Sequence, residues 1–288
     1  MSRRFFYLFV LAVGSCLLSC DEINAQQTVS QCVTPVYRVL VTPLKTFTDV
    51  FTNSSGTYYT GFNIDVLFAI AKRANFSFTI GTTPNSAFGS SSGQVSTSGE
   101  TCFGSNSGVS IFQQQQYDIY AVALDQVSEY LTAVDFTTPI FRSDVQILYN
   151  VQAGLNNNTK YSVISQTAGK DVLIMTKNPR LMAIWANIQA NAPTSLPQTY
   201  DDAINLIKNQ GYAFVGRTPL IDQEVCNSYY QIAKDPTIFK QTYASFAVQK
   251  GNNDLLDKIN RAILSLQEDN TIPTLLTKWF PCSNFQCS

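Results

Sequence analysis

Short β-branched strands alternate with amphipathic helices along most of this 288-residue chain, and this alternation limits the fold more than any other feature. Residues 37–42 alternate apolar and polar side chains, which predicts a strand. Residues 62–74 repeat apolar side chains at helical i, i+3, i+4 and i+7 spacing, and residues 76–80 alternate again. This order predicts a parallel strand pair joined by a right-handed crossover.

The rest of the chain continues the alternation. Residues 117–124 form a nearly continuous apolar run, as expected of a strand buried on both faces. Residues 81–116 are rich in Ser, Gly and Gln, and predict a surface loop or a hairpin near Cys102. The sequence therefore predicts the α/β class, with mainly parallel sheets flanked by helices. Further strands are predicted at residues 145–151, 161–165, 212–215 and 243–248, with helices between and after them.

Composition excludes several classes of function. The chain is 45% hydrophobic and 14% charged, and it has no run of Lys or Arg, so we expect no nucleic-acid partner. It contains no His, which removes Ser-His and Cys-His nucleophiles and the commonest zinc ligand. We predict no catalytic residues, no metal and no cofactor. The length suits one large domain or two lobes with their own cores.

Residues 1–25 are typical of an export signal. Arg3 and Arg4 precede an apolar stretch, residues 5–18, that is too short to span a membrane, and cleavage is expected after Ala25. Residues 17–20 also fit a bacterial lipobox, which would anchor a periplasmic lipoprotein at Cys20. No later segment reaches the ~20 apolar residues of a membrane span. The sequence predicts a secreted protein, with the lipoprotein as the alternative.

Cysteines and sequons fit an exported chain. No Cys-x-x-Cys pair occurs, so the cysteines beyond the signal are expected to form disulfides rather than bind metal. Three Asn-x-Ser/Thr sequons permit glycosylation. The cysteines are Cys32, Cys102, Cys226, Cys282 and Cys287, and the sequons begin at Asn53, Asn75 and Asn157.

Four motifs follow one another in order between residues 61 and 280. The first is a Gly-aromatic-x-x-Asp helix start at residues 61–65, and the second is an apolar strand after Asp118 that leads to Val-Asp-Phe-x-x-Pro at residues 134–139. The third is Tyr-Ala-Phe at residues 212–214, and the fourth joins residues 246–251 to a Lys-Trp-Phe helix end. Together they resemble solute-binding protein family 3 and the ligand-binding core of ionotropic glutamate receptors.

The resemblance implies a two-lobed, clamshell fold of the type II periplasmic-binding-protein class. Lobe 1 would hold residues 30–145 and 245–288, and lobe 2 would hold residues 146–244, with two strands crossing between them. A small ligand, amino acid-like or an organic anion, would bind in the cleft between the lobes. The receptor channels insert membrane helices that this chain lacks, so a membrane receptor or transporter would be a separate partner.

The resemblance also implies a disulfide that joins Cys226 to a cysteine near the C-terminus. Cys287 is the expected partner and Cys282 is the rival. Cys32 and Cys102 are expected to form a second bridge, and the fifth cysteine would be free or would pair with another molecule.

The family's ligand-binding residues are changed in this chain. Tyr130 stands where amino-acid-binding members carry the Arg that grips a carboxylate, Asp125 stands where a Thr is usual, and Arg217 stands where an acid is usual. On one reading, Asp125 or Glu129 and Arg217 bind a ligand of altered polarity across the cleft. On the other, Asp125 and Arg217 form a salt bridge, or are solvated surface groups, in a protein that has lost its ligand. Phe47 would stack on the ligand or simply pack, and Thr167 would begin an anion-binding helix N-terminus or serve as a cap.

These residues predict an extracellular protein that captures a small polar or anionic ligand. The alternatives are a ligand-free decoy or interaction module and a dehydratase that uses a cleft carboxylate. On the ligand-binding reading, Arg217→Ala is expected to abolish binding without lowering the melting temperature of the ligand-free protein.

Overall fold

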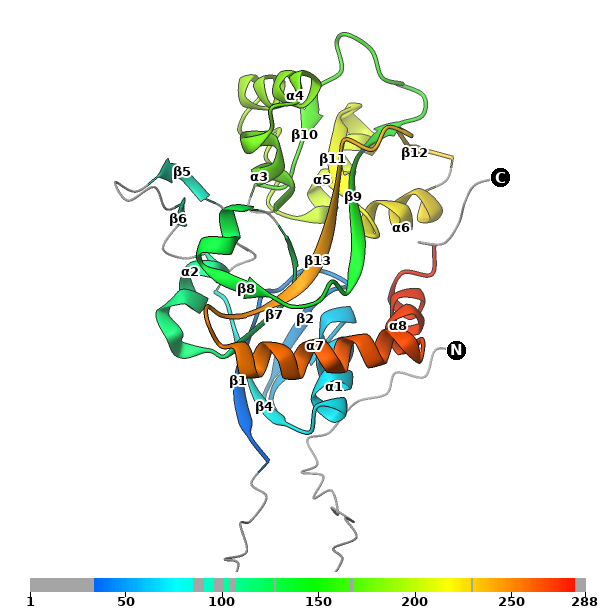
Figure 1. Ribbon diagram of the computed structural model, residues 1–288. Coiled ribbons are helices and arrows are strands. Elements are labelled where there is room, and N and C mark those ends of the chain that lie inside the picture. The colour runs from blue at the N-terminus through cyan, green and yellow to red at the C-terminus, as the bar shows by residue number, and fades with distance from the viewer. Residues whose placement is uncertain are drawn as a thin grey trace, which may run out of the picture. The chain divides into compact units, whose positions relative to one another are not determined.

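The computed structural model describes residues 34–84, 91–95, 101–103, 107–126, 128–165, 168–228 and 230–282. For residues 91–95 and 101–103 it describes only the backbone. These residues form one α/β unit in which helices flank a sheet of nine strands (Figure 1). The described strands are β1 (Val36–Val41), β2 (Asp49–Asn53), β3 (Gly56–Thr60), β4 (Ser77–Thr82), β5 (Ser91–Val95), β6 (Thr101–Phe103), β7 (Ile119–Asp125), β8 (Val134–Phe136), β9 (Phe141–Asn150), β10 (Tyr161–Ser162), β11 (Ala213–Arg217), β12 (Ile232–Lys234) and β13 (Lys240–Gln249). Four of them form two separate pairs, β2 with β3 and β5 with β6, and the other nine form the sheet.

Most of the helices belong to one of two lobes. Lobe 1 comprises β1, β4, β7, α1 (Phe62–Arg73), α7 (Asn253–Glu268) and α8 (Thr271–Trp279), and lobe 2 comprises β10, β11, β12 and the four helices from α3 (Ala168–Met175) to α6 (Leu220–Asn227). A π-helix at Phe112–Gln116 and a 3-10 helix at Ser128–Thr132 complete the elements. The α-helices are α1 (Phe62–Arg73), α2 (Gly108–Ile111), α3 (Ala168–Met175), α4 (Pro179–Ala190), α5 (Tyr200–Gln210), α6 (Leu220–Asn227), α7 (Asn253–Glu268) and α8 (Thr271–Trp279).

Each lobe contains at least one parallel strand pair, and two strands that run antiparallel to each other connect the lobes. The main path of the sheet runs β10-β11-β9-β13-β7-β1-β4. β1 pairs in parallel with β4 and β7, and β10 pairs in parallel with β11. β9 and β13 run side by side between the two groups of helices (Figure 1), and β13 pairs first with β9 and then with β7. The predicted α/β class is confirmed, and the parallel pairs lie on either side of these crossing strands.

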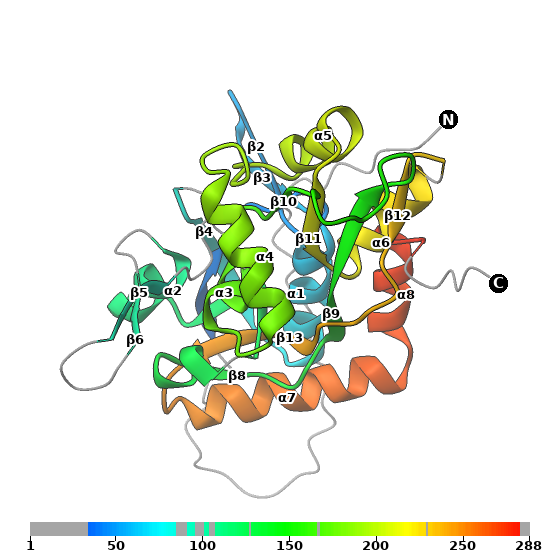
Figure 2. The ribbon, with the colours of Figure 1, turned by 90° about the horizontal axis from the view of Figure 1, so that it is seen from above.

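Each lobe buries apolar side chains on both faces of its strands. In lobe 1, Val39 and Ile119 pack against α1 and α7, whereas Leu40 and Tyr120 pack against Val109 and other residues on the opposite face. In lobe 2, α3 and α4 cover one face of β11, and α5 and α6 cover the other (Figure 2). Continuous apolar strands are expected when helices cover both faces, which explains the run at residues 117–124.

The segment before α1 forms a hairpin, β2–β3, which the sequence pattern does not predict. The Asn53 side chain accepts a hydrogen bond from the Ser55 N–H at 2.8 Å, and Gly56 has a φ of 137°. An Asn turn followed by a glycine in the left-handed region is suited to a tight reversal, and it offsets the weak strand pattern on either side.

The three sequon asparagines, Asn53, Asn75 and Asn157, are exposed.

The disulfide prediction is corrected at one residue. Cys226, in α6, is bonded to Cys282, just after α8, and not to the expected Cys287. The two Cα atoms lie 6.0 Å apart, within the range that a disulfide spans. Cys282 and Cys287 both follow α8 in sequence, so the sequence alone could not decide which of the two reaches Cys226. Cys287, Cys32 and the signal segment lie outside the described residues, as does the side chain of Cys102.

Candidate functional site

A pocket lies where the two lobes meet the crossing strands. Its cavity volume is about 80 Å³, which leaves room for a few waters at the ~10–15 Å³ that each requires. Ligand pockets are usually larger, so a ligand here must be compact or must enter when the lobes separate. Most of the lining side chains are apolar or aromatic. They belong to Leu44, Phe47, Ala123, Leu124, Phe141, Ser143, Ile164, Gly169, Tyr200, Phe214, Val215, Gly216, Arg217, Thr218 and Leu220.

One charged pair lies beside this pocket, and we call Asp125 and Arg217 the floor pair. Asp125 ends β7 of lobe 1, and Arg217 ends β11 of lobe 2. The guanidinium Nη2 of Arg217 donates to Asp125 Oδ1 and, at 2.8 Å, to Ser143 Oγ. Thr242 Oγ1 donates to the same carboxylate oxygen at 2.8 Å. Ser143 lies on β9 and Thr242 on β13, so the floor pair joins the lobes at both crossing strands.

Burial sets the electrostatics of the floor pair. Asp125 is fully buried, and the Arg217 side chain is 18% exposed. Desolvation lowers the pKa of the Arg217 guanidinium from its ordinary value, because burial disfavours the charged form. The second carboxylate oxygen of Asp125 and Nε of Arg217 are buried without a hydrogen-bond partner. Each charge is therefore compensated mainly by the other.

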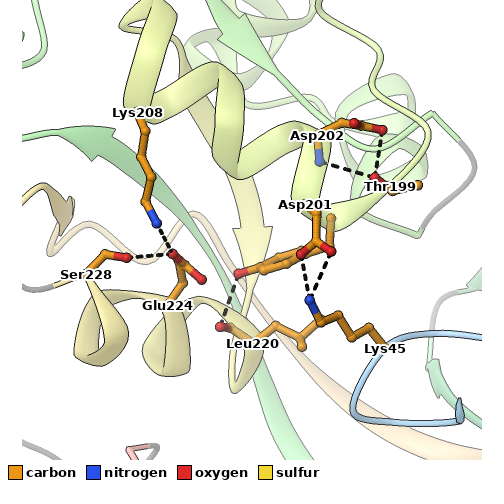
Figure 3. Close-up of polar contacts among 9 residues, drawn as sticks. Lys45, Thr199, Asp201, Asp202, Lys208, Leu220, Glu224 and Ser228 are labelled. Atoms are coloured by element: carbon orange, nitrogen blue, oxygen red, sulfur yellow. Dashed lines mark hydrogen bonds and ion pairs between the residues drawn. The ribbon is translucent and has the colours of Figure 1, made fainter.

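A second ion pair, Lys45 with Asp201, links the lobes at the solvent-exposed edge of the site, and we call it the rim pair. Lys45 follows β1, and its Nζ lies 2.7 Å from Asp201 Oδ1 and 3.0 Å from Oδ2, in the first turn of α5 (Figure 3). The two side chains are 62% and 72% exposed. Thr199 caps the same helix by accepting from the Asp202 N–H at 3.1 Å. The Thr-x-x-Asp sequence thus begins α5 at the edge of the site.

A hydrogen bond and an ion pair connect α5 to α6 beside the pocket. Tyr200 donates its hydroxyl to the Leu220 carbonyl at 3.1 Å. Burial, and then the nearby carboxylates of α6, raise the pKa of the Tyr200 phenol, so it stays a hydrogen-bond donor at neutral pH. Lys208 and Ser228 both donate to Glu224, at 3.1 and 2.8 Å (Figure 3). This side of the pocket is held by several bonds within lobe 2.

The structure brings some of the predicted site residues together and separates others. Arg217 and Phe47 line the pocket, and Asp125 lies behind Arg217. Phe47 is also packed, because its ring lies against Phe141 and Phe280. Tyr130 is 1% exposed in a separate apolar cluster and is not among the lining residues.

Two other predicted positions cannot be placed at the pocket. Thr167 and the side chain of Glu129 lie outside the described residues. Sequence reasoning missed Tyr200 and Ser143, although a Thr-x-x-Asp cap before a helix and a serine inside a buried strand both signal special positions. Within the described part of the chain, no three acidic or cysteine side chains gather as a metal site.

Fold and pocket together define a two-lobed α/β ligand-binding protein. The model for bacterial extracellular solute-binding proteins, family 3, matches residues 104–281, well over half of the chain. The chain belongs to this family. The model for the L-glutamate- and glycine-binding site of ligated ion channels matches residues 33–153. The resemblance inferred from the four sequence motifs is thus confirmed, and both families are named for binding.

Two known proteins illustrate the relationship. A putative ABC transporter arginine-binding protein 2 of Escherichia coli (strain K12) is 25% identical over 171 residues, which is 54% of this chain and 63% of that protein. The chain therefore matches less than two thirds of that relative's length. The structure of the Drosophila muscle GluRIIB complex with glutamate matches 86% of this chain and 99% of its own, with a TM-score of 0.74 at 18% identity. This likeness concerns the fold alone.

None of the helices in the described ranges combines the length and apolar character of a membrane span.

Proposed function

We propose that this protein is an exported solute-binding protein that captures a small molecule between its lobes without chemical conversion. The observation that carries the proposal is the pocket, which draws its lining from both lobes and from the crossing strand β9. In binding proteins of this type, hinge closure around a ligand converts binding into a change of conformation. A membrane receptor or transporter would then bind the closed conformation of the protein. If the protein is exported from a eukaryotic cell, the sequons would carry glycans.

A thermal-shift screen with isothermal titration tests this proposal. The library should hold amino acids, dicarboxylates, sugar acids, phosphorylated metabolites and uncharged aromatic compounds. A ligand at a hundredfold excess over its dissociation constant adds about 2.7 kcal/mol of stability by mass action. Each hit should be incubated with the protein and analysed for products, because turnover would contradict a purely binding role.

Ala123→Phe is the variant that connects a hit to the pocket. Ala123 lines the cavity on β7, and a phenyl group there would fill the space that the ligand needs. Binding is expected to fall at least about tenfold, the loss that a misfit of a methylene or more produces in an apolar pocket. Ala153→Phe, at an exposed turn, is the matched control and should bind normally. Equal binding by both variants would place the ligand elsewhere.

A non-binding interaction module is the second candidate, and one observation favours it. The floor pair already satisfies the charge of Arg217, which matches the salt-bridge reading of the sequence. Silence of the whole library, with the protein shown to be folded, would select this candidate. The dehydratase alternative has no such support, because the described lining residues include no carboxylate.

A further inference from the structure

The charges at the pocket cancel each other, and this limits the ligand that the proposed function can use. Arg217 is the one charged side chain among the described lining residues, and its Nη2 is bonded to the fully buried Asp125. Asp125 lies at the end of a buried strand and is also held by Thr242 at 2.8 Å. It has no open path to solvent, so an incoming anion cannot simply displace it.

A carboxylate ligand at Arg217 would therefore leave two anions around one guanidinium. The surrounding side chains, which include Leu124, Phe141 and Phe214, offer little compensation. An uncompensated charge in such surroundings is strongly unfavourable. A free amino acid meets a second obstacle, because the lining described here contains no carboxylate to compensate the charge of its ammonium group.

The remaining polar side chains of the lining are already bonded within the protein. Ser143 donates to the Thr218 carbonyl at 2.8 Å, the Thr218 hydroxyl accepts from the Asp144 N–H at 2.8 Å, and Tyr200 donates to a carbonyl of α6. By contrast, Nε of Arg217 is a buried donor without a partner. A ligand of matching polarity therefore carries an uncharged acceptor for this guanidinium on an apolar body.

We propose that the pocket binds a compact, uncharged molecule, an apolar or aromatic ring bearing one neutral hydrogen-bonding group such as a carboxamide, and disfavours free amino acids and organic anions. This inference rests on the proposed function and names the ligand class of the same site. The four aromatic side chains of the lining, Phe47, Phe141, Tyr200 and Phe214, suit a flat ring.

Isosteric amide and acid pairs test the proposal, since they differ in charge and hardly in shape. The probes are benzamide with benzoate, phenylacetamide with phenylacetate, and indole-3-acetamide with indole-3-acetate, and glutamate and arginine serve as amino acids. In titrations at pH 7, we expect at least one amide to bind at least about tenfold more tightly than its acid, because like-charge juxtaposition is strongly disfavoured. Ala123→Phe should remove that binding.

Asp125→Asn is the decisive variant, because it frees the charge of Arg217. It should reverse the preference, so that the acid of the pair binds more tightly than the amide. Asp269→Asn is the matched control: it removes an aspartate that pairs with Arg73 outside the pocket lining, and should leave the preference unchanged. If Asp125→Asn does not fold, the double variant Asp125→Leu/Arg217→Met replaces the pair with apolar side chains, and should still reject the acids.

The outcomes separate this inference from the proposed function. An acid or an amino acid that binds wild-type protein as tightly as the amides, and is lost in Ala123→Phe, overturns the inference while the binding function stands. Rejection of acids by wild type with no reversal in Asp125→Asn also overturns it, because the floor pair would not be the cause. Silence of every probe and of the wider library overturns both.

Discussion

The rim pair and the floor pair make the same kind of contact in opposite surroundings. Lys45 and Asp201 are mostly exposed, whereas Asp125 is fully buried and Arg217 nearly so. The rim pair keeps most of its water and is screened by salt, so its net contribution to stability is small. The floor pair has given up its water and depends on its partner and on the hydroxyls of the two crossing strands.

The difference indicates which link between the lobes can open. Two exposed, flexible side chains at the rim can separate with little change in free energy. The floor pair is buried at the crossing strands, so we expect it to stay intact if the lobes rotate relative to each other. We therefore expect any opening of the lobes to break the rim pair first and to leave the floor pair in place.

The largest expected effect concerns a third, covalent link between the lobes. Cys226→Ser/Cys282→Ser opens a bridge with a sequence separation of 56, and chain entropy predicts a loss of about 4 kcal/mol in the free energy of unfolding. Urea denaturation of the double variant and wild type measures it. A loss below about 1 kcal/mol, or a peptide map that shows Cys226 bonded elsewhere, would contradict the assignment.

The next largest effect is expected at the floor. Arg217→Ala leaves a buried carboxylate without its cation, which should lower the free energy of unfolding by about 3 kcal/mol and the melting temperature by roughly 6–12 °C. This replaces the sequence-based expectation that stability would be unchanged. Arg73→Ala is the control, because Arg73 pairs with Asp269 and these side chains are 39% and 40% exposed. Equal losses in the two variants would remove the distinction between buried and exposed pairs.

The smallest effect is expected at the rim. A double-mutant cycle of Lys45→Ala and Asp201→Ala should give a coupling energy below about 1 kcal/mol, and 1 M salt should abolish most of it. The same cycle with Asp125→Asn and Arg217→Met should give a larger coupling that salt leaves nearly intact. The comparison would be overturned if 1 M salt left the coupling energy of the rim pair unchanged, or if it abolished the coupling energy of the floor pair.

Much of the fold could be predicted from periodicity. The helix predicted at residues 62–74 is α1, and the apolar run at residues 117–124 is β7 within two residues at its start and one at its end. Periodicity identifies a strand but not its neighbours, so the antiparallel pairing of β9 with β13 follows only from the family resemblance or the structure. The β2–β3 hairpin was missed because its strands are short and mostly exposed.

The site was predicted less well, for a physical reason. Alignment with the family identified Asp125 and Arg217, yet it could not decide whether they face a ligand or each other. That depends on the burial of Asp125 and on hydroxyls from β9 and β13, far away in sequence. Tyr130 lies in the 3-10 helix after β7, and its side chain packs in a core cluster away from the pocket, which alignment by sequence position could not reveal.

The central claim is that a small ligand binds in the pocket between the lobes, and methyl NMR tests it most directly. Leucine-labelled protein should be titrated with the tightest ligand found in the screens. We predict that the largest shifts fall on Leu44, Leu124 and Leu220, which line the pocket, while Leu181 and Leu266, in the cores of the two lobes, stay nearly unchanged. Shifts centred on core or surface leucines, or no saturable shift with any compound, would contradict the claim.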